Sequence, residues 1–389
     1  MFHIATEKEI IEGKVTDVYF ERTLEVLRKK GIDKHVTAEI ICKGFPDGWE
    51  WAVLAGLDEC LAMLQKLDIR VRALDEGRIF RANEPVLEIE GMYSVFCKYE
   101  TAILGLLCQA SGIATRACRC KAAAGDKTVL SFGARRMHPA IAPMIERNAY
   151  LGGCDGVAVV KSAQEIGINP SGTMPHALIL IVGDTLKAAQ AFDEVIDPAV
   201  QRIILIDTFN DERTEAIRLA NALGEKFKAI RIDTPASRRG NLKEIVREVR
   251  WELDRSGSGR IKIFVSGGIT EHDIEELRDD VDGFGVGTFI SNAPVIDFAM
   301  DIVDIEGKPF SKRGKLSGKK SVLTCSVCGL ANVTPKVNES IPCDCGGIME
   351  ERLNPVLNAG QNLFDFPGIE EIRRRLFRQV KDMNRGQIK

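Results

Sequence analysis

Two glycine turns that follow neighbouring apolar segments have the residue types of a phosphate-binding site. The run Ile261–Val265 leads into a Ser-Gly-Gly turn, and Gly283–Val286 leads into a Gly-Thr turn. A helical segment follows each turn, so backbone N–H groups and the positive end of a helix dipole can face one anion. Glycine lets the backbone approach that anion closely. We predict a phosphate cup formed by Ser266, Gly267, Gly268, Gly287 and Thr288, the alternative being two tight turns without a ligand.

Charged and aromatic side chains follow other apolar runs in the same region. Phe132 and Arg135 follow one run, Asp207 another, and Arg231 and Asp233 a third. Arginine offers a planar set of donors to phosphate or carboxylate. Aspartate accepts hydrogen bonds from hydroxyls or holds Mg²⁺ directly or through water. Such a set suits a phosphorylated sugar diphosphate, with Phe132 able to stack on a flat ring beside it.

Each of these residues also has an ordinary structural explanation. Arg135, taken alone, can be a solvated or ion-paired side chain, and Asp207 can be the N-cap of the helix predicted from Asp211 onward. His138, which precedes a proline, is interpreted as structural. The basic loop with Arg238 and Arg239 either binds phosphate or is a solvated turn.

The sequence predicts that strands and helices alternate in the region that positions these residues. From Thr128 onward, apolar runs recur about every 20–30 residues, each with a helical segment after it. Runs that are apolar throughout are typical of strands covered on both faces, as in a parallel sheet. We predict an α/β fold with an irregular, incomplete barrel, in which chemistry lies at the carboxyl ends of strands. The seven predicted strands are 128–132, 156–160, 177–182, 202–207, 228–232, 261–265 and 283–286.

Composition excludes several classes of partner and suggests a compartment. The chain has 389 residues and a formal net charge of −3, so we expect neither nucleic acid nor an anionic membrane as a partner. No uninterrupted apolar run reaches the roughly 20 residues of a membrane helix. The N-terminal residues are too polar for a signal peptide. The odd count of 11 cysteines favours a reducing compartment, and we expect a cytoplasmic protein.

Four cysteines near the C-terminus have the spacing of a zinc knuckle. Cys325 and Cys328 form a CxxC pair, and Cys343 and Cys345 form a tighter CxC pair before two glycines. Thiolates on such turns can hold a structural, tetrahedral Zn²⁺, the alternative being four free cysteines. The tail from Ile369 reads as a basic amphipathic helix for packing or oligomerisation.

Eight motifs, in this order along residues 15 to 295, resemble the nicotinate phosphoribosyltransferase family, with nicotinamide and quinolinate phosphoribosyltransferases as structural relatives. The length and the final lobe resemble an archaeal or thermophile-type member. The motifs are Thr16–Tyr19, Tyr99–Leu104, Phe132–Arg136, Gly172–His176, Ile206–Thr208, Arg231–Thr234, Ser266–Ile269 and Gly285–Thr288.

The resemblance implies a domain organisation and a reaction. An N-terminal α/β sandwich domain (1–112) would pack on the barrel (113–300), followed by a small C-terminal lobe (301–389) with the zinc knuckle (325–345) and the packing helix. The family joins nicotinate to phosphoribosyl pyrophosphate, giving nicotinate mononucleotide and pyrophosphate in NAD salvage. Mg²⁺ and ATP take part, and the active sites are shared within a homodimer or larger oligomer.

The resemblance also assigns roles to individual residues. Phe132 would stack on the pyridine ring, and Thr173 would line the nicotinate pocket. Arg231 and Arg135 would bind phosphoribosyl pyrophosphate or the nicotinate carboxylate. Asp207 and Asp233 would hold the ribose hydroxyls and Mg²⁺, and the two glycine turns would bind the 5′-phosphate. Tyr19 would reach the nicotinate ring of a neighbouring subunit.

His176 is the residue that the resemblance implicates in ATP use. The family's equivalent histidine is transiently phosphorylated by ATP, and a neutral imidazole can attack phosphorus near pH 7. The alternative is a buried or capping histidine at the start of a strand. Met174-Pro175 and Thr234-Pro235 depart from the family's usual residues, which puts the efficiency of ATP coupling and the role of the second loop in question.

Other functions remain open at this point. Nicotinamide would require an acidic residue facing its amide, for which Asp155 is the candidate. Quinolinate, with two carboxylates, would require a denser basic pocket. A different class of function is a non-catalytic zinc-ribbon binding or scaffold protein.

Overall fold

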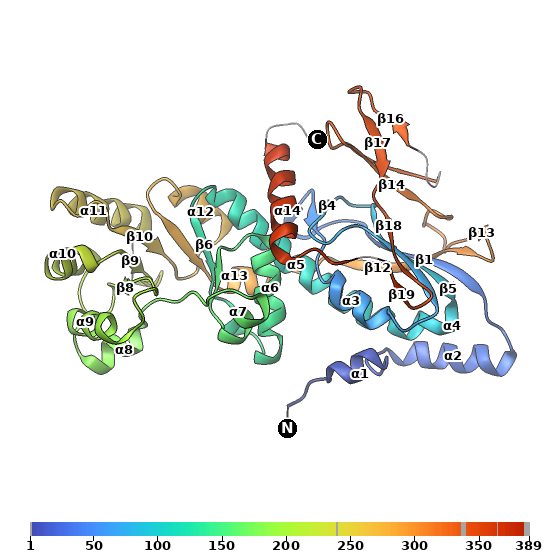
Figure 1. The fold of residues 1–389 in the computed structure, drawn as a ribbon, viewed down its shortest axis with the longest axis horizontal. Helices are drawn as coiled ribbons and strands as arrows, with labels where there is room; N and C mark the ends of the chain where they lie inside the picture. The colour runs from blue at the N-terminus through green and yellow to red at the C-terminus, as the bar shows by residue number, and fades with distance from the viewer. Residues whose placement is uncertain (1, 239, 336–339, 364, 385–389) are drawn as a thin grey trace. The chain divides into compact units, whose positions relative to one another are not determined.

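The computed structural model describes residues 2–238, 240–335, 340–363 and 365–384. The chain divides into two compact units, whose elements are labelled in Figure 1. We call Arg116–Ala293 the central unit. Met1–Thr115 together with Pro294–Lys389 form the terminal unit, so the central unit is inserted into a discontinuous one.

The central unit is built on a parallel sheet, as predicted. Its described residues contribute six strands in the order β7-β6-β11-β10-β9-β8. In the described sheet β7 and β8 are edge strands and do not pair with each other, which confirms an incomplete barrel. The strands are β6 (Thr128–Ser131), β7 (Gly156–Val157), β8 (Ile203–Leu205), β9 (Ala229–Ile232), β10 (Lys262–Val265) and β11 (Gly283–Val286).

Helices alternate with these strands along the chain. After β6 and β7 they are α6 (Ala142–Gly152), α7 (Val160–Ile166), α8 (His176–Val182) and α9 (Thr185–Val195). After β8, β9, β10 and β11 they are α10 (Glu212–Leu223), α11 (Leu242–Arg255), α12 (Glu271–Leu277) and α13 (Thr288–Ser291).

One predicted strand is wrong, because the run 177–182 lies in helix α8. Met174 forms a single parallel bridge with Ile204, and the helix then begins after Pro175 and ends at Gly183 in the left-handed region (φ 85°). Only Ile179 of this helix is buried, whereas Ile181 is 83% exposed. The apolar run 177–182 therefore belongs to a helix with exposed apolar side chains, and not to a strand that is covered on both faces of a sheet.

The terminal unit is organised around an antiparallel sheet that joins both ends of the chain. Seven strands of its described residues are ordered β13-β12-β1-β5-β3-β18-β19. A common core contains side chains from this sheet and from α3 (Leu57–Leu64). The strands are β1 (His35–Cys42), β3 (Ile69–Ala73), β5 (Pro85–Met92), β12 (Phe298–Ile305), β13 (Lys308–Pro309), β18 (Asn354–Asn358) and β19 (Gln361–Asn362).

Smaller elements complete the terminal unit. Before α3, Ala52–Val53 (β2) pairs with Ile79–Phe80 (β4) in a two-stranded antiparallel sheet. A second antiparallel sheet contains β14 (Ser321–Cys325), β15 (Ala331–Thr334), β16 (Ile341–Pro342) and β17 (Ile348–Glu351). Helices α1 (Glu7–Ile11), α2 (Val18–Lys30) and α4 (Tyr93–Phe96) lie in the N-terminal segment, and α14 (Ile369–Asn384) forms the predicted tail helix.

The longest helix, α5 (Glu100–Ala124), runs from the terminal into the central unit. With the turn and helix before it, Tyr93–Ala124 is long and apolar enough to cross a membrane by length and composition. However, 67% of its most apolar window is buried inside the protein, which is typical of a core helix.

Candidate active site

A cavity of about 720 Å³ lies in the central unit where four neighbouring strands end. Phe132 follows β6, Asp233 follows β9, Ser266 follows β10 and Gly287 follows β11, and all four line the cavity. The carboxyl ends of parallel strands share one edge of a sheet, as the prediction assumed. Of the predicted residues, the cavity lining includes Phe132, Arg135, Arg231, Asp233, Ser266, Gly267, Gly268, Gly287 and Thr288.

Arg231 is the centre of a hydrogen-bond network in this cavity. Its Nη1 donates to Thr173 Oγ1 at 2.7 Å and its Nε to Ser266 Oγ at 2.7 Å. Its Nη2 lies 3.2 Å from Asp233 Oδ1, which also accepts from Ser266 Oγ at 2.6 Å. The guanidinium carbon is 5.1 Å from the centroid of the Phe132 ring. One charged group is thus fixed against two hydroxyls, a carboxylate and an aromatic face, which leaves little reorganisation for ligand binding.

The two glycine turns lie side by side because β10 and β11 pair in parallel, with Val265 opposite Phe284. Gly267 and Gly268 both have positive φ, 87° and 75°, a conformation that favours glycine. The first turn of α12 is already capped, since Thr270 Oγ1 accepts from the Asp273 N–H in a reciprocal capping box. The predicted anion cup therefore consists of the turns themselves and not of the N-terminus of α12.

Gly285 allows the Phe132 ring to lie directly against β11. A Cβ at Gly285 would sit 2.5 Å from a ring carbon of Phe132 and 3.2 Å from the Cβ of Ser266. Gly133 has a similar constraint, because its Cβ would be 2.4 Å from the carbonyl oxygen of Gly287. The glycines of these motifs thus serve the packing of the ring and the turns as well as the approach of a ligand.

His176 and Asp207 form a pair beside the Arg231 network. His176 is the first residue of α8, and its Nε2 lies 3.1 Å from Asp207 Oδ1. The hydrogen bond to Asp207 raises the pKa of His176, Asp233 raises it further, and burial and Arg231 oppose the shift. The Asp207 side chain is only 4% exposed, so its main neighbour is the imidazole.

The interpretation of these two residues as helix caps is wrong. The N-cap of α10 is Asp211, whose carboxylate accepts from the Thr214 N–H at 2.9 Å, so Asp207 is not the cap. The residue at the N-cap of α8 is Pro175, so His176 is neither a cap nor the start of a strand. By contrast, His138 accepts from the Ala140 N–H at 3.2 Å, which confirms its structural interpretation.

Several cavity residues had not been singled out as site residues from the sequence. Arg116 is 7% exposed and its guanidinium lies 4.1 Å from the centroid of the Phe289 ring. Arg116 lies inside the long helix α5, where nothing in the sequence marks it. Phe289 directly follows the Gly-Thr turn and could have been included from that position. With Arg116, Arg135, Arg136 and Arg231, the described lining is more basic than the sequence indicated.

Comparison with known proteins agrees with this geometry. Family models described as the N-terminal and C-terminal domains of quinolinate phosphoribosyl transferase match residues 17–111 and 113–301. Nicotinate phosphoribosyltransferase pncB1 of Mycobacterium tuberculosis is 30% identical over 356 residues, covering 80% of this chain and 78% of that protein. The chain belongs to the nicotinate phosphoribosyltransferase family.

Solved structures extend the likeness over nearly the whole chain. Nicotinate-nucleotide pyrophosphorylase from Pyrococcus furiosus is 51% identical, covers 98% of both chains and has a TM-score of 0.96. Human nicotinic acid phosphoribosyltransferase is 19% identical, covers 94% of both chains and has a TM-score of 0.73, which shows a shared fold. The fold class is therefore that of this phosphoribosyltransferase family, including the segment that follows the central unit.

Five residues considered for the family's chemistry are not among those that line the cavity, namely Thr173, His176, Asp207, Asp155 and Tyr19. Asp155 precedes β7, accepts from the Val129 N–H at 2.8 Å and pairs with Lys121 at 2.9 Å, so it does not line the cavity. Tyr19 lies on α2 of the terminal unit and is 53% exposed, next to Val18, which is 58% exposed. Asp155 is thus not the amide partner that nicotinamide binding would need.

The four C-terminal cysteines come together in the terminal unit. The sulfur atoms of Cys325, Cys328, Cys343 and Cys345 all lie within 4.8 Å of one another. Cys325 and Cys345, and likewise Cys328 and Cys343, are 3.5 Å apart. Four thiolates at about 2.3 Å from a tetrahedral Zn²⁺ would be separated by roughly 3.8 Å, so the cluster can hold a metal such as zinc.

Proposed function

We propose that the protein is a nicotinate phosphoribosyltransferase, which joins nicotinate to phosphoribosyl pyrophosphate and releases nicotinate mononucleotide and pyrophosphate for NAD salvage. The observation that carries this proposal is the Arg231 network beside the two glycine turns. It combines an anion cup, a carboxylate for hydroxyls and an aromatic ring in one cavity. Those are the groups that a phosphorylated ribose and a charged pyridine require.

The residues of the cavity divide the work of binding. The turns after β10 and β11 take the 5′-phosphate, and Asp233 accepts from the ribose hydroxyls. When the pyridine ring stacks on Phe132, its carboxylate comes within reach of Arg231 or Arg135. This is because the Arg231 guanidinium already lies over the ring of Phe132. Thr173 does not itself line the cavity, and it supports this arrangement by accepting a hydrogen bond from Arg231.

The reaction needs no general base. The lone pair of the pyridine nitrogen forms the bond to the anomeric carbon of ribose, and the bond from that carbon to the pyrophosphate oxygen breaks with its electron pair. Positive charge develops on the sugar and negative charge on the departing pyrophosphate. Cavity arginines stabilise the departing group, and stacking holds the nitrogen in line.

Mg²⁺ fits this cavity at Asp233. The Asp233 carboxylate lines the cavity and is 22% exposed, so it can offer an oxygen to a cation, whereas Asp207 is almost fully buried against His176. When bound, Mg²⁺ supplies positive charge to the pyrophosphate. We therefore assign the cation to Asp233 and an orienting role to Asp207.

ATP coupling is proposed to proceed through phosphorylation of His176. If Asp207 accepts the proton on Nε2, the lone pair of the imidazole lies on Nδ1. Nδ1 then attacks the terminal phosphorus of ATP, forming an N–P bond as the P–O bond to ADP breaks. The Met174 bridge to β8 fixes the start of α8 and thus the position of the ring.

A structural zinc ion and a homo-oligomer complete the proposal. The distances in the cysteine cluster support Zn²⁺, for which elemental analysis should find about one zinc per chain. Exposed apolar residues on α2 and α8, among them Val18, Val26, Leu180 and Ile181, support contact with further copies of the chain. We propose shared active sites to which Tyr19 contributes, in a cytoplasmic enzyme.

The decisive experiment compares nicotinate, nicotinamide and quinolinate as substrates, with phosphoribosyl pyrophosphate, Mg²⁺ and ATP, using metal-replete protein. We expect nicotinate to have the highest kcat/KM. No turnover of nicotinate would overturn the proposal. Nicotinamide should react poorly, because the described cavity lining offers four arginines but one carboxylate, Asp233, which we have assigned to the ribose hydroxyls and Mg²⁺.

Quinolinate is the second candidate, favoured by one observation. Four arginines in the described lining could bind two carboxylates as well as phosphates. Release of carbon dioxide from quinolinate with a kcat/KM above that of nicotinate would establish this alternative. No turnover of any of the three pyridines would instead favour a non-catalytic protein.

A further inference from the structure

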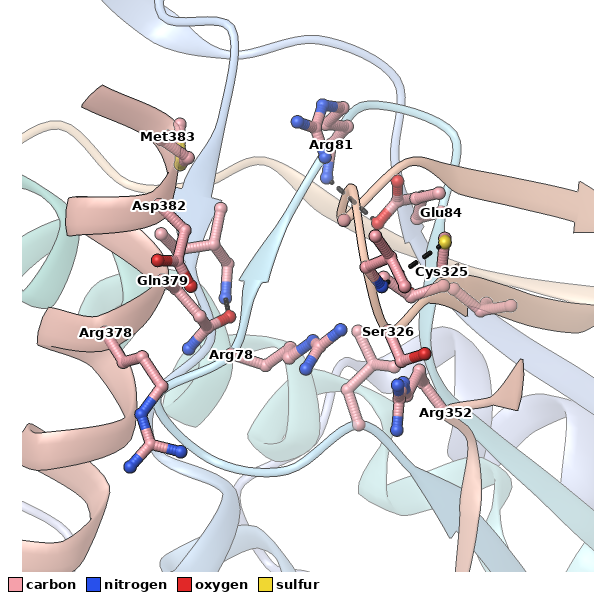
Figure 2. Close-up of a pocket in the computed structure, with 17 residues that line it drawn as sticks. Arg78, Arg81, Glu84, Cys325, Ser326, Arg352, Arg378, Gln379, Asp382 and Met383 are labelled. Atoms are coloured by element: carbon pink, nitrogen blue, oxygen red, sulfur yellow. Dashed lines mark hydrogen bonds between the residues drawn. The ribbon is translucent and has the colours of Figure 1, made fainter. Parts of the chain in front are cut away.

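A second basic pocket lies in the terminal unit and is lined by none of the residues of the proposed active site. It has a volume of about 260 Å³ and lies between the turn that precedes β4, the β14–β15 hairpin and helix α14 (Figure 2). We call it the arginine pocket. Its described lining includes four arginines and two carboxylates, namely Arg78, Arg81, Arg352, Arg378, Glu84 and Asp382.

The walls of the arginine pocket are fixed by contacts within this unit. On α14, Gln379 accepts from the Ile79 N–H at 3.0 Å and donates to the Gly77 carbonyl at 3.1 Å. Gly77 has φ 77°, and a Cβ there would lie 2.5 Å from Ile372. Arg375 Nη1 donates to Asp75 Oδ2 at 3.0 Å. The turn before β4 is thus docked closely on α14, which sets the position of Arg78.

Arg78 is half-buried and forms no ion pair in the described structure, although the charges of Asp75 and Glu84 oppose the lowering of its pKa. In the part of the chain that the structure describes, no carboxylate pairs with its guanidinium. The two acids whose charges act on Arg78 have other partners, because Asp75 binds Arg375 and Glu84 accepts from the backbone N–H of Arg81 at 3.1 Å. Burial, followed by the charge of Arg352, lowers the pKa of Arg78. A buried cation beside another cation is costly unless an anion joins them.

Arg352, on the other wall of the pocket, has a counter-charge but also a buried donor without a partner in the described structure. Its Nε is buried and has no hydrogen-bond partner in the described structure, and its Nη2 lies 3.5 Å from Glu350. Figure 2 shows the Arg78 side chain extending toward Ser326 and Arg352, with Arg378 and Asp382 on the helix at the opposite side. An orphaned donor and an unpaired guanidinium therefore border the same small volume.

We propose that the arginine pocket binds a phosphate-bearing anion at a site separate from catalysis. The lining has four guanidinium groups and two carboxylates, and Glu350 lies beside Arg352, so positive charge remains in excess and suits a phosphate anion. Several arginines from different directions suit an anion with oxygens on several sides. The volume is below that of typical drug-sized ligand sites, which favours inorganic phosphate, pyrophosphate or one phosphoryl end of a small metabolite.

Such an anion would stabilise the β14–β15 hairpin, which carries Cys325 and Cys328. Cys325, Ser326 and Val327 line the pocket on one side and residues of α14 line it on the other. An anion bound between them connects the two by charge-assisted hydrogen bonds and stabilises the folded terminal unit over the unfolded chain. The expected consequence is a dependence of thermal stability on phosphate.

The test measures thermal unfolding and calorimetric binding of the zinc-loaded full chain with inorganic phosphate, at an ionic strength held constant with chloride. The variants are Arg78→Met and Arg378→Met. The matched control is Arg374→Met, an exposed arginine of the same helix that does not line the pocket. Phosphate at the glycine turns contributes equally to all four proteins, so differences between them report on the arginine pocket.

We expect the wild type and Arg374→Met to gain roughly 5 °C in unfolding midpoint at a hundredfold excess of phosphate over Kd. Arg78→Met and Arg378→Met should lose at least half of that rise. Without phosphate, Arg78→Met should be no less stable than the wild type, because it removes an unpaired charge.

Equal phosphate responses in wild type and both pocket variants would overturn the proposal, even if one variant alone folded poorly. Arg78→Met could also respond less to phosphate merely because it is less stable than the wild type without phosphate. That result would show a structural role for Arg78 and would refute the proposal. Pyrophosphate and adenosine monophosphate, titrated in parallel, distinguish a free anion from the phosphoryl end of a metabolite.

Discussion

Arg231 and Arg78 are two partly buried arginines in cavities of the same chain, but their surroundings are opposite. Arg231 has a carboxylate, two hydroxyls and an aromatic face within contact distance. Arg78 has no carboxylate partner in the described structure and faces Arg352. The guanidinium of Arg231 is thus fixed before any substrate arrives, whereas that of Arg78 has no ion-pair partner in the described structure.

The difference shows two ways in which a protein can use the same side chain. A neutralised, hydrogen-bonded arginine is preorganised, so it can stabilise charge that develops during a reaction without a large reorganisation. An unpaired arginine destabilises the free protein and favours the form with an anion bound. Arg231 therefore suits catalysis, and Arg78 suits ligand-dependent stability.

The largest expected effect is that of Arg231→Lys. The contacts to Thr173, Ser266 and Asp233 use three different nitrogens of the guanidinium, which the single nitrogen of lysine cannot replace, so we expect kcat/KM for nicotinate to fall by about 10²–10³-fold. Steady-state kinetics measures this. Arg238→Lys, in the exposed basic loop, is the control and should change kcat/KM by less than about threefold if that loop is a solvated turn. Equal losses in both variants would contradict the special position of Arg231.

The next effect concerns ATP. His176→Asn should abolish the stimulation of nicotinate turnover by ATP while leaving ATP-independent turnover, because it removes the nucleophile but not the Arg231 network. Turnover with and without ATP, and phosphorylation from labelled ATP, would be measured. Persistent stimulation by ATP in this variant would exclude the phosphohistidine.

The pH dependence of ATP stimulation follows from the same pair. The bond to Asp207 raises the pKa of His176 above its ordinary 6.5, so the imidazole becomes protonated at a higher pH than a free histidine. Only the neutral form carries a nucleophilic lone pair, so stimulation should fall about tenfold per unit as pH drops below that pKa. Asp207→Asn should move this fall to lower pH, and an unchanged profile would contradict the pair.

A smaller effect is expected for Gly285→Ala. The added methyl would meet the Phe132 ring and displace it, so KM for nicotinate should rise about tenfold. The control is Gly105→Ala, an exposed glycine of α5 where a Cβ meets nothing within 4 Å. A normal KM in Gly285→Ala would show that the ring position does not matter for the pyridine.

The cysteine cluster predicts a loss of stability without a loss of chemistry. Cys328→Ser should reduce the zinc content from about one to near zero per chain and lower the unfolding midpoint, because the metal links both halves of the β14–β17 region. Cys108→Ser, outside the cluster, should keep its zinc. Elemental analysis and thermal unfolding distinguish the two. Full zinc content in Cys328→Ser would remove this residue from the metal site.

Much of the central unit could be predicted from the sequence because parallel strands have a simple signature. Six apolar runs became β6 to β11, and polar residues after them met at one edge. The run 177–182 failed because residue type alone does not distinguish a buried strand from a short helix with exposed apolar residues. The Asp207–His176 contact could not be read from spacing, since it joins α8 to the end of β8.

The arginine pocket was invisible in the sequence for a different reason. Arginine is a residue type that is usually exposed, so nothing marks Arg78, Arg352 and Arg378 as members of one pocket. They are separated by up to 300 positions along the chain, as is the hydrogen-bonded pair of Arg375 and Asp75. Only the docking of α14 on the β4 turn brings them together. Tertiary pairing over such distances has no local pattern that would reveal it.

The pairing of β1 with β12 and of β3 with β18 has a consequence for synthesis of the chain. The central unit is continuous and leaves the ribosome complete, whereas the seven-stranded sheet of the terminal unit still lacks the strands that follow Pro294. Domains fold as units once their residues have emerged, so the central unit should fold first. Until residues 294–362 emerge, the edges of β1 and β3 remain open to pairing with another nascent chain, and this is the interval in which a chaperone would protect the protein.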